Sequence, residues 1–245
     1  MGIDLLAVTE HHKDDGKFRG ETSLNNKSME IAGFHNVATH RAPGQKGGTA
    51  WYLKKGLNVE HWEGAKIPEQ LKQYQVERCW VNVTCASENW YLCTVYTPTE
   101  GGKSSDDEKY NGILQILDLD METLKKMGAP HIIYGDFNAH VGNESVRHGI
   151  IGNHKEVNRN GHKLKQWLDK QGKILVNNQM QTKGLWTRQE NEKRTVIDYM
   201  IMDKELVPWV KALVIDDERE ITTLSTDHNL LSSMINCNYT RLKWE

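Results

Sequence analysis

Short apolar runs bounded by turn residues dominate the first hundred positions of the chain. Residues 3–9 form one such run and end at Glu10, which is typical of a buried strand that carries a carboxylate at its C-terminal end. Further runs with strand character, joined by connections rich in Gly, Pro, Ser or Asn, occupy residues 31–39, 49–53, 79–85 and 90–96. The pattern predicts successive members of β-sheets.

Helical spacing appears in the middle of the chain. Between residues 106 and 127 apolar residues recur with helical periodicity, acidic residues come early and Lys125-Lys126 comes late, as the helix dipole favours. Residues 131–135 follow as a short buried strand that runs into Asp136. The spacing of Leu164, Trp167 and Leu168 predicts a second helix over residues 160–170.

The last third of the chain returns to strands. They are predicted at residues 174–177, 184–188, 195–202, 212–215 and 230–236. No repeat, low-complexity tract or linker interrupts the sequence, so we expect one α/β domain over residues 1–245. Its economical architecture is two packed mixed β-sheets flanked by helices.

Composition and charge limit the possible partners. The 245 residues include 31 Lys and Arg against 33 Asp and Glu, a formal net charge of -2, so affinity for a polyanion must come from a local patch. No apolar stretch has the length of a spanning helix, and the first residues lack the features of a signal peptide. The four cysteines form no Cys-x-x-Cys pair. We expect a monomeric intracellular protein, in the nucleus or cytoplasm, with reduced thiols and no membrane contact.

The densest chemical signal is Gly135-Asp136-Phe137-Asn138, just beyond a predicted buried strand. Side chains two residues apart on an extended segment share a face, so the carboxylate and the carboxamide lie together. The alternative is an ordinary junction between a strand and a turn, where Gly, Asp and Asn are common.

This string resembles the central motif of the endonuclease/exonuclease/phosphatase family, which includes abasic-site endonucleases and the endonuclease domains of non-LTR retrotransposons of the LINE type. The family's other motifs follow in order, as Val8-Thr9-Glu10, Val95-Tyr96-Thr97-Pro98, Ile197-Asp198-Tyr199 and Ser225-Thr226-Asp227-His228. Asn158-Arg159-Asn160-Gly161 and Leu185-Trp186-Thr187-Arg188 add similarity to the retrotransposon endonucleases. The resemblance implies a four-layer α/β sandwich.

The resemblance also implies a metal-dependent phosphodiester hydrolase. Such a reaction needs a divalent ion to neutralise phosphoryl oxygens, and hard ions take carboxylate ligands. Glu10 and Asp227 are the metal ligands that the resemblance implies, for Mg²⁺ or for Mn²⁺ in its place. The structural alternatives are a turn residue for Glu10 and a helix cap or surface turn for Asp227.

The resemblance assigns the remaining catalytic roles as follows. Asp136 takes the proton of the attacking water, Asn138 holds the phosphate, and Tyr96 donates to a phosphate oxygen. His228 contacts the phosphate opposite the metal, and Asp198 holds its other ring nitrogen, which fixes the tautomer and favours the charged ring. As alternatives, Asp198 fits an outward position on a strand and Tyr96 fits a packed strand end.

The substrate class depends on the flanking segments. Asn160, Trp186 and Arg188 are candidate substrate-binding residues, with Trp186 as a wedge or stacking surface. Basic residues near the later motifs favour a nucleic-acid backbone. The resemblance to retrotransposon endonucleases implies double-stranded DNA as the partner and a reverse transcriptase domain in a longer parent polyprotein. The alternatives are a solvated charged face, or a phosphoesterase of the same fold that acts on a phospholipid or inositol phosphate.

The chain departs from the family at its beginning. The family starts with a strand carrying an Asn, followed by a helix, and only nine residues precede Glu10 here. We therefore expect an N-terminally truncated domain, an unpaired edge in one sheet, and apolar surface on Leu5 and Leu6 that is less well covered. A catalytically inactive remnant or DNA-binding module is the alternative that follows from this difference.

Overall fold

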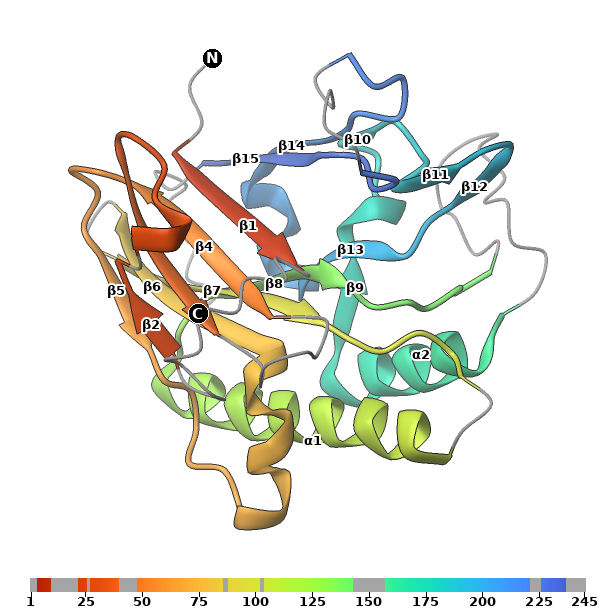
Figure 1. Ribbon diagram of the computed structural model, residues 1–245, viewed down its shortest axis with the longest axis horizontal. Coiled ribbons are helices and arrows are strands. Elements are labelled where there is room, and N and C mark those ends of the chain that lie inside the picture. The colour runs from red at the N-terminus through yellow and green to blue at the C-terminus, as the bar shows by residue number, and fades with distance from the viewer. Residues whose placement is uncertain are drawn as a thin grey trace, which may run out of the picture.

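The computed structural model describes residues 4–9, 22–25, 27–39, 48–85, 88–101, 104–142, 157–220 and 226–236. Two α-helices, α1 (Ser104–Met127) and α2 (Arg159–Gln171), combine with several β-sheets in this part of the chain (Figure 1). None of the helices in these ranges combines the length and the apolar character that crossing a membrane requires.

A six-stranded sheet forms the centre of the molecule, in the order β5-β6-β7-β8-β13-β9. The pairing of β7 with β8 is parallel and the other pairings are antiparallel, so the sheet is mixed as predicted. The strands span β5 (Val59–Trp62), β6 (Arg78–Cys85), β7 (Glu88–Tyr96), β8 (His131–Asp136), β13 (Asp198–Asp203) and β9 (Lys173–Leu175).

Both faces of this sheet are buried. Ile133 belongs to the core that α1 and α2 cover, while its neighbour Ile132 belongs to the core on the opposite face. Successive side chains on a strand point to opposite faces, so a strand buried on both sides consists of a continuous apolar run. Gly135 is required near the end of β8, because a Cβ there would lie 2.0 Å from the carbonyl oxygen of Val95 on β7.

A second layer of strands packs on the sheet face opposite the helices. It consists of a four-stranded sheet in the order β1-β4-β3-β2, a three-stranded sheet in the order β10-β14-β15, and a hairpin of β11 and β12. The strands span β1 (Leu5–Thr9), β2 (Thr22–Leu24), β3 (Phe34–Thr39), β4 (Thr49–Lys54), β10 (Thr182–Lys183), β11 (Arg188–Glu190), β12 (Lys193–Thr195), β14 (Val210–Ile215) and β15 (Leu231–Ile235). Four 3₁₀ helices in these ranges, η1 (Lys27–Met29), η2 (Glu69–Glu77), η3 (Val176–Asn178) and η4 (Lys204–Trp209), connect the strands.

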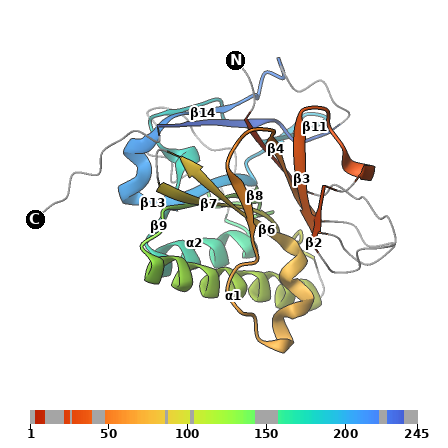
Figure 2. The ribbon, with the colours of Figure 1, turned by 90° about the vertical axis from the view of Figure 1, so that its left-hand side faces the viewer.

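The layers differ in one respect from the predicted four-layer sandwich. Figure 2 shows α1 and α2 on the same side of the six-stranded sheet, with β14 and its neighbours on the other side. Within the described ranges, no α-helix covers the outer face of the second strand layer. The mixed α/β architecture is therefore confirmed, and the fourth, helical layer is not found in this part of the chain.

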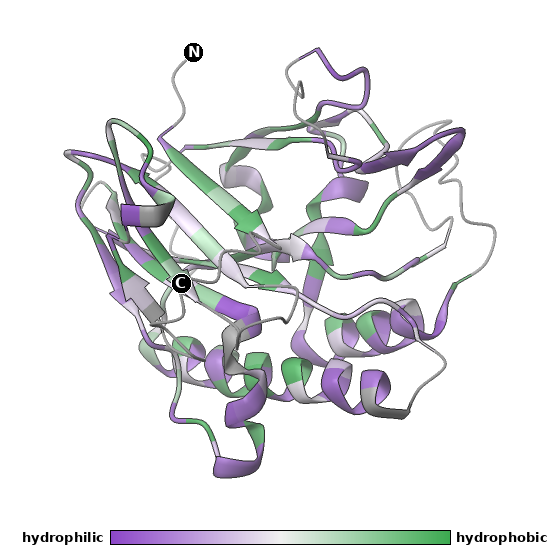
Figure 3. Cartoon of the chain, viewed as in Figure 1, coloured by the Kyte–Doolittle hydropathy of each residue, from purple (hydrophilic) through white to green (hydrophobic). Residues whose placement is uncertain are grey.

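The second layer is also not one continuous sheet. Among the described residues, β1 pairs only with β4 and β15 pairs only with β14, so each strand has one edge without a described partner strand. Most of β1 is hydrophobic (Figure 3), yet all five of its residues are only half-buried, which matches the expectation of less well covered apolar surface on Leu5 and Leu6.

The predicted element boundaries hold best where hydrophobic periodicity is long, as in α1. They were wrong between residues 174 and 202. The strand expected at 174–177 continues as η3 after Leu175. Of the strand expected at 184–188, only Arg188 lies in a strand, at the start of β11, and β10 ends before it. These segments are two or three residues long, so their sequence carries too few alternating positions to define a strand.

Candidate active site

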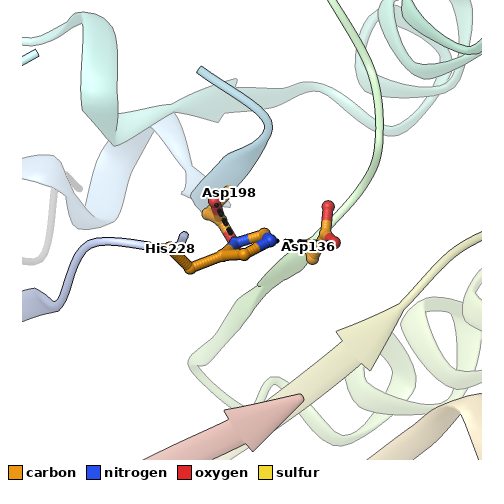
Figure 4. Close-up of side chains that lie close together, drawn as sticks. All are labelled: Asp136, Asp198 and His228. Atoms are coloured by element: carbon orange, nitrogen blue, oxygen red, sulfur yellow. Dashed lines mark hydrogen bonds and ion pairs between the residues drawn. The ribbon is translucent and has the colours of Figure 1, made fainter. Parts of the chain in front are cut away.

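Two aspartates meet where β8 and β13 run side by side. Asp136 ends β8 and Asp198 begins β13, and the antiparallel register pairs these two residues directly. Directly opposed residues of an antiparallel pair point to the same face. His228, which lies shortly before β15, completes a cluster in which the ligand atoms of all three side chains lie within 4.8 Å of one another (Figure 4).

The His228 imidazole is held between the two aspartates. Its Nδ1 lies 3.0 Å from both carboxylate oxygens of Asp198, which is the contact that the family resemblance implies. Its Nε2 lies 3.9 Å from Oδ2 of Asp136, close enough for an ion pair but too long for a hydrogen bond. With Nδ1 directed at Asp198, Nε2 is the ring nitrogen that faces Asp136, and it carries a proton when the ring is positively charged.

The cluster keeps this imidazole positively charged. Burial lowers the pKa of His228, but the hydrogen bond that its ring donates to Asp198 and the charges of Asp198, Asp136 and Asp227 outweigh burial and raise the pKa to about 9. Carboxylates within a few ångströms favour the charged form of an imidazole. At neutral pH the site therefore contains an imidazolium, and its side chain remains 27% exposed to solvent.

Asp136 and Asn138 are fixed by a local turn. The Asn138 main-chain N–H donates to Oδ1 of Asp136 at 2.8 Å, and its side-chain Nδ2 donates to Oδ2 at 3.1 Å. The same Nδ2 donates to the Thr97 carbonyl at 2.8 Å, and Asn138 has a left-handed backbone with φ of 44°. Asn adopts this conformation more readily than most residues. The carboxylate of Asp136 is thus oriented at a residue exposure of only 2%.

Residues at the start of α2 hold this turn in place through hydrogen bonds. Asn160 donates through Nδ2 to the carbonyl oxygens of Pro98 and Asn138, at 3.0 and 3.1 Å. Asn158 caps α2 by accepting from the Gly161 N–H at 2.7 Å, and it also accepts from the His140 N–H at 2.9 Å. Asn160 is 2% exposed and positions Asn138, and its contact with substrate stays a prediction.

Asp227 lies apart from the three-residue cluster. Its Oδ2 lies 2.6 Å from Nε of Arg188, and NH2 of the same guanidinium lies 2.9 Å from Oε2 of Glu190. Burial raises the pKa of Asp227, but the hydrogen bond from Arg188 and the charges of His228 and Arg188 lower it overall. The structure therefore pairs the predicted metal ligand Asp227 with the predicted substrate-binding residue Arg188.

Thr187, Asn229 and Arg219 hold the His228 segment in place, and the sequence assigned none of them a role in the site. The Thr187 hydroxyl accepts from the main-chain N–H groups of Ile197 and Asp198 at 2.9 and 3.1 Å, and the Thr187 carbonyl accepts from the Asn229 N–H at 2.7 Å. Arg219 donates to the side chain of Asn229 at 2.9 Å and to the Thr226 carbonyl at 2.8 Å.

These contacts span residues 226–229, on both sides of His228. Arg219 itself has φ of 58°, a conformation that is uncommon for a residue with a side chain. This backbone angle is the one signal of its role, and it is visible only in three dimensions.

Two further candidates lie next to these residues. Tyr96 ends β7 and stands opposite Asp136 in the parallel register of β7 and β8. Trp186 is half-buried, and its carbonyl accepts from Nδ2 of Asn229 at 2.6 Å. A cavity of about 490 Å³ adjoins the turn and is lined by residues that include Asn138, His140, Arg159 and Arg188.

The donor set suits a hard divalent cation. Among the described residues, Asp136, Asp198 and His228 form a candidate metal-binding cluster, and carboxylate oxygens are the ligands that Mg²⁺ prefers. The charged imidazole of His228 offers no lone pair, so the carboxylates, with Asp227 nearby, are the groups able to hold an ion. Glu10, the other predicted ligand, lies outside the described residues.

Comparison with solved structures identifies the fold. The endonuclease domain of TRAS1, a telomere-specific non-LTR retrotransposon, has a TM-score of 0.59 at 15% identity, over 85% of this chain and 81% of that one. The AP endonuclease LMAP from Leishmania major has a TM-score of 0.70 at 15% identity, over 95% of this chain and 78% of that one. A variant of the 3′ phosphatase NExo from Neisseria, bound to a product DNA hairpin, has a TM-score of 0.65 at 15% identity, over 95% and 88%.

Comparison at the sequence level points in the same direction. A search of curated proteins found no match for the sequence. The family described as endonuclease-reverse transcriptase matches residues 90–232, which is more than half of the chain and includes Asp136, Asp198 and His228. The chain has the endonuclease/exonuclease/phosphatase fold and belongs to the endonuclease-reverse transcriptase family.

Proposed function

We propose that this protein is a Mg²⁺-dependent phosphodiesterase that nicks double-stranded DNA, in the manner of a retrotransposon endonuclease. The observation that carries the proposal is the imidazolium of His228, held by Asp198 and directed toward Asp136. A fixed positive charge beside a fixed carboxylate is what attack of water on a phosphodiester requires.

The chain's own residues divide the work as follows. Asp136 orients the attacking water and accepts its proton, because the Asn138 turn fixes its carboxylate. The Nε2–H of His228 donates to a nonbridging phosphate oxygen and stabilises the charge that develops there. Tyr96 stands opposite Asp136, where its hydroxyl is able to donate to the phosphate. Asn138 acts through Asp136, because both hydrogens of its Nδ2 already donate to Thr97 and Asp136. A bound divalent ion supplies Lewis-acid stabilisation of the leaving oxygen.

The resemblance to DNA-processing enzymes supports the choice of substrate. NExo was solved with a product DNA hairpin, and TRAS1 is a retrotransposon whose endonuclease domain shares the fold. In this chain Arg159 and Arg188 line the cavity beside Asn138, and guanidinium groups are able to bind the phosphates of a nucleic-acid backbone. The family description supports a reverse transcriptase as the partner domain.

The test is a plasmid-nicking assay. Purified protein is incubated with supercoiled plasmid, with Mg²⁺ or with chelator, beside Asp136→Asn and His228→Asn. The matched control is His35→Asn, an exposed histidine on β3 outside the cluster. Nicking that requires Mg²⁺, survives in the control and disappears in both site variants supports the proposal. Intact binding of plasmid without Mg²⁺-dependent nicking contradicts it and favours a DNA-binding remnant.

A further inference from the structure

The ion pair between Arg188 and Asp227 has no role in the reaction proposed above. Arg188 contacts two carboxylates at once, with Nε 2.6 Å from Asp227 and NH2 2.9 Å from Glu190. Arg188 is also the bridge partner of His228, and the Gln189 N–H donates to the Asp227 carbonyl at 2.7 Å. Arg188 thus contacts the segment that carries His228 both through its guanidinium and through the backbone of its strand.

The guanidinium stands between the acidic residues and the adjoining cavity. Arg188 lines the cavity together with Asn138, His140 and Arg159. Arg159 already binds Asp107 on α1 at 2.7 Å, so its charge is partly neutralised. The Arg188 side chain remains 33% exposed, which leaves it room to change partners.

A divalent cation bound to the Asp227 carboxylate would weaken its ion pair with Arg188, which uses Oδ2 of that carboxylate. The cation repels the Arg188 guanidinium, and the guanidinium then needs another anion in place of the Asp227 carboxylate. Phosphate is the anion that best replaces it, because the planar fork of arginine matches two phosphate oxygens. The cavity beside Asn138 is where a phosphate of the DNA backbone has access to that fork.

We propose that Arg188 exchanges partners, pairing with Asp227 in the metal-free protein and with a DNA backbone phosphate once a divalent cation occupies Asp227. This inference rests on the proposed function and adds a coupling between the two ligands. Metal binding releases Arg188 for DNA, and DNA binding to Arg188 releases Asp227 for metal. By thermodynamic linkage, each ligand strengthens the binding of the other by the same factor.

The first test measures Mn²⁺ binding to the protein without DNA, by electron paramagnetic resonance of free Mn²⁺. Arg188→Gln removes the competing cation, and we expect its Kd for Mn²⁺ to fall about ten-fold. The matched control is Arg194→Gln, which removes the same charge from the facing strand of the same hairpin. We expect the control to change the Kd less than about two-fold, because exposed charges are screened.

The second test measures the coupling, by fluorescence anisotropy of a labelled duplex oligonucleotide with chelator or with Ca²⁺. In the wild-type protein we expect Ca²⁺ to tighten DNA binding about ten-fold, and in Arg188→Gln only about two-fold. Arg188→Lys keeps the charge without the planar fork, and we expect an intermediate coupling. Thermal melting of each variant shows whether it is folded. If Arg188→Gln is unfolded, Arg188→Lys replaces it in both measurements.

Either of two results overturns the proposal. One is that Arg188→Gln binds Mn²⁺ no more tightly than the Arg194→Gln control, or that no variant binds Mn²⁺ at all. If Arg188→Gln does not fold, Arg188→Lys is compared with the control instead. The other is equal coupling in the wild-type and Arg188 variants. Neither measurement depends on cleavage, so a protein that shows the exchange but never nicks plasmid contradicts the proposed function alone. A protein that nicks plasmid without the exchange contradicts this inference alone.

Discussion

The paired strands β8 and β13 have a histidine close to each of their two ends, and the two histidines differ in charge. At one end Asp136 and Asp198 face His228, and at the other His131 and Asp203 face Lys173. Each end therefore has a histidine beside an aspartate, but β8 supplies only His131, whereas His228 comes from the segment before β15.

The second end is a closed, charge-balanced cluster. Lys173 Nζ lies 2.6 Å from Oδ1 of Asp203 and in hydrogen-bond contact with Nε2 of His131, whose Nδ1 donates to the Ala129 carbonyl at 2.9 Å. Burial lowers the pKa of His131, and the positive charge of Lys173 lowers it further. His131 is therefore neutral and accepts a hydrogen bond, with its side chain only 6% exposed.

The difference shows that the neighbours of a histidine decide what it can do. His228 is surrounded by carboxylates and reaches solvent, so it is charged and able to meet a ligand. His131 shares its aspartate with a lysine and is buried, so it stabilises the sheet. A residue list cannot separate these two roles, whereas the charge and exposure of the neighbours do.

The largest expected effect comes from removing the carboxylate that holds His228. In Asp198→Asn we expect Mg²⁺-dependent nicking to fall about 100-fold or more, because the imidazolium loses its charge partner and orientation. NMR titration of the His228 ring should show its pKa falling from about 9 toward the ordinary value. The matched variant is Asp203→Asn at the other end, which should leave the nicking rate unchanged. Equal rate losses in both variants would refute the distinction between the ends.

The pH dependence of stability should have opposite signs for the two histidines. His228 has a folded pKa raised to about 9, so its contribution is complete below the unfolded value near 6.5 and is lost as pH rises through 9. That loss is on the order of 3 kcal/mol, from about 1.36 kcal/mol per pKa unit. His131 has a lowered pKa, so its contribution is present above pH 6.5 and is lost as pH falls below it.

Urea unfolding between pH 5 and 9 measures both contributions. The unfolding free energy of the wild-type protein is compared with that of His228→Asn and of His131→Asn at each pH. The wild-type advantage over His228→Asn should shrink toward high pH, and the advantage over His131→Asn should shrink toward low pH. Parallel curves for the two variants would contradict the assigned charge states.

Lys173→Met should lower the free energy of unfolding by about 2 kcal/mol, because it leaves Asp203 and His131 without their shared donor. Activity per folded molecule should stay unchanged. The matched control is Lys170→Met in the same region, whose exposed pair with Asp118 should contribute less than about 1 kcal/mol. A loss of activity in folded Lys173→Met would show that the two ends of the strands are coupled.

The smallest expected effect concerns the loop that carries His228. Arg219→Gly removes the tether to Thr226 and Asn229 and also relieves the left-handed backbone, where φ is 58°. We expect kcat to fall about five-fold, while KM and the unfolding free energy change little, since a relieved strain of about 1 kcal/mol offsets the lost contacts. Lys211→Gly, at an exposed residue of β14, is the control for loss of a basic residue. An unchanged kcat would exclude a positioning role for Arg219.

Patterns of several residues were readable from the sequence, whereas single contacts were not. The apolar run before Asp136 predicted β8, and the long periodicity over residues 106–127 predicted α1. The order of the sequence motifs predicted the endonuclease/exonuclease/phosphatase fold. The β11–β12 hairpin and the scaffolding role of Asn160 were missed, because a two- or three-residue strand and a buried amide leave no periodic signal.

The sequence by itself determined which chemical groups the chain carries and which strands deliver them, because hydrophobic periodicity and motif order are local properties of the chain. Only the tertiary structure decided the state of those groups. It pairs Asp227 with Arg188, charges His228 and keeps His131 neutral, through neighbours that are 30 to 42 residues away in sequence. Coulomb interactions and desolvation depend on distance and burial in space, and these are fixed only when the sheets pack together.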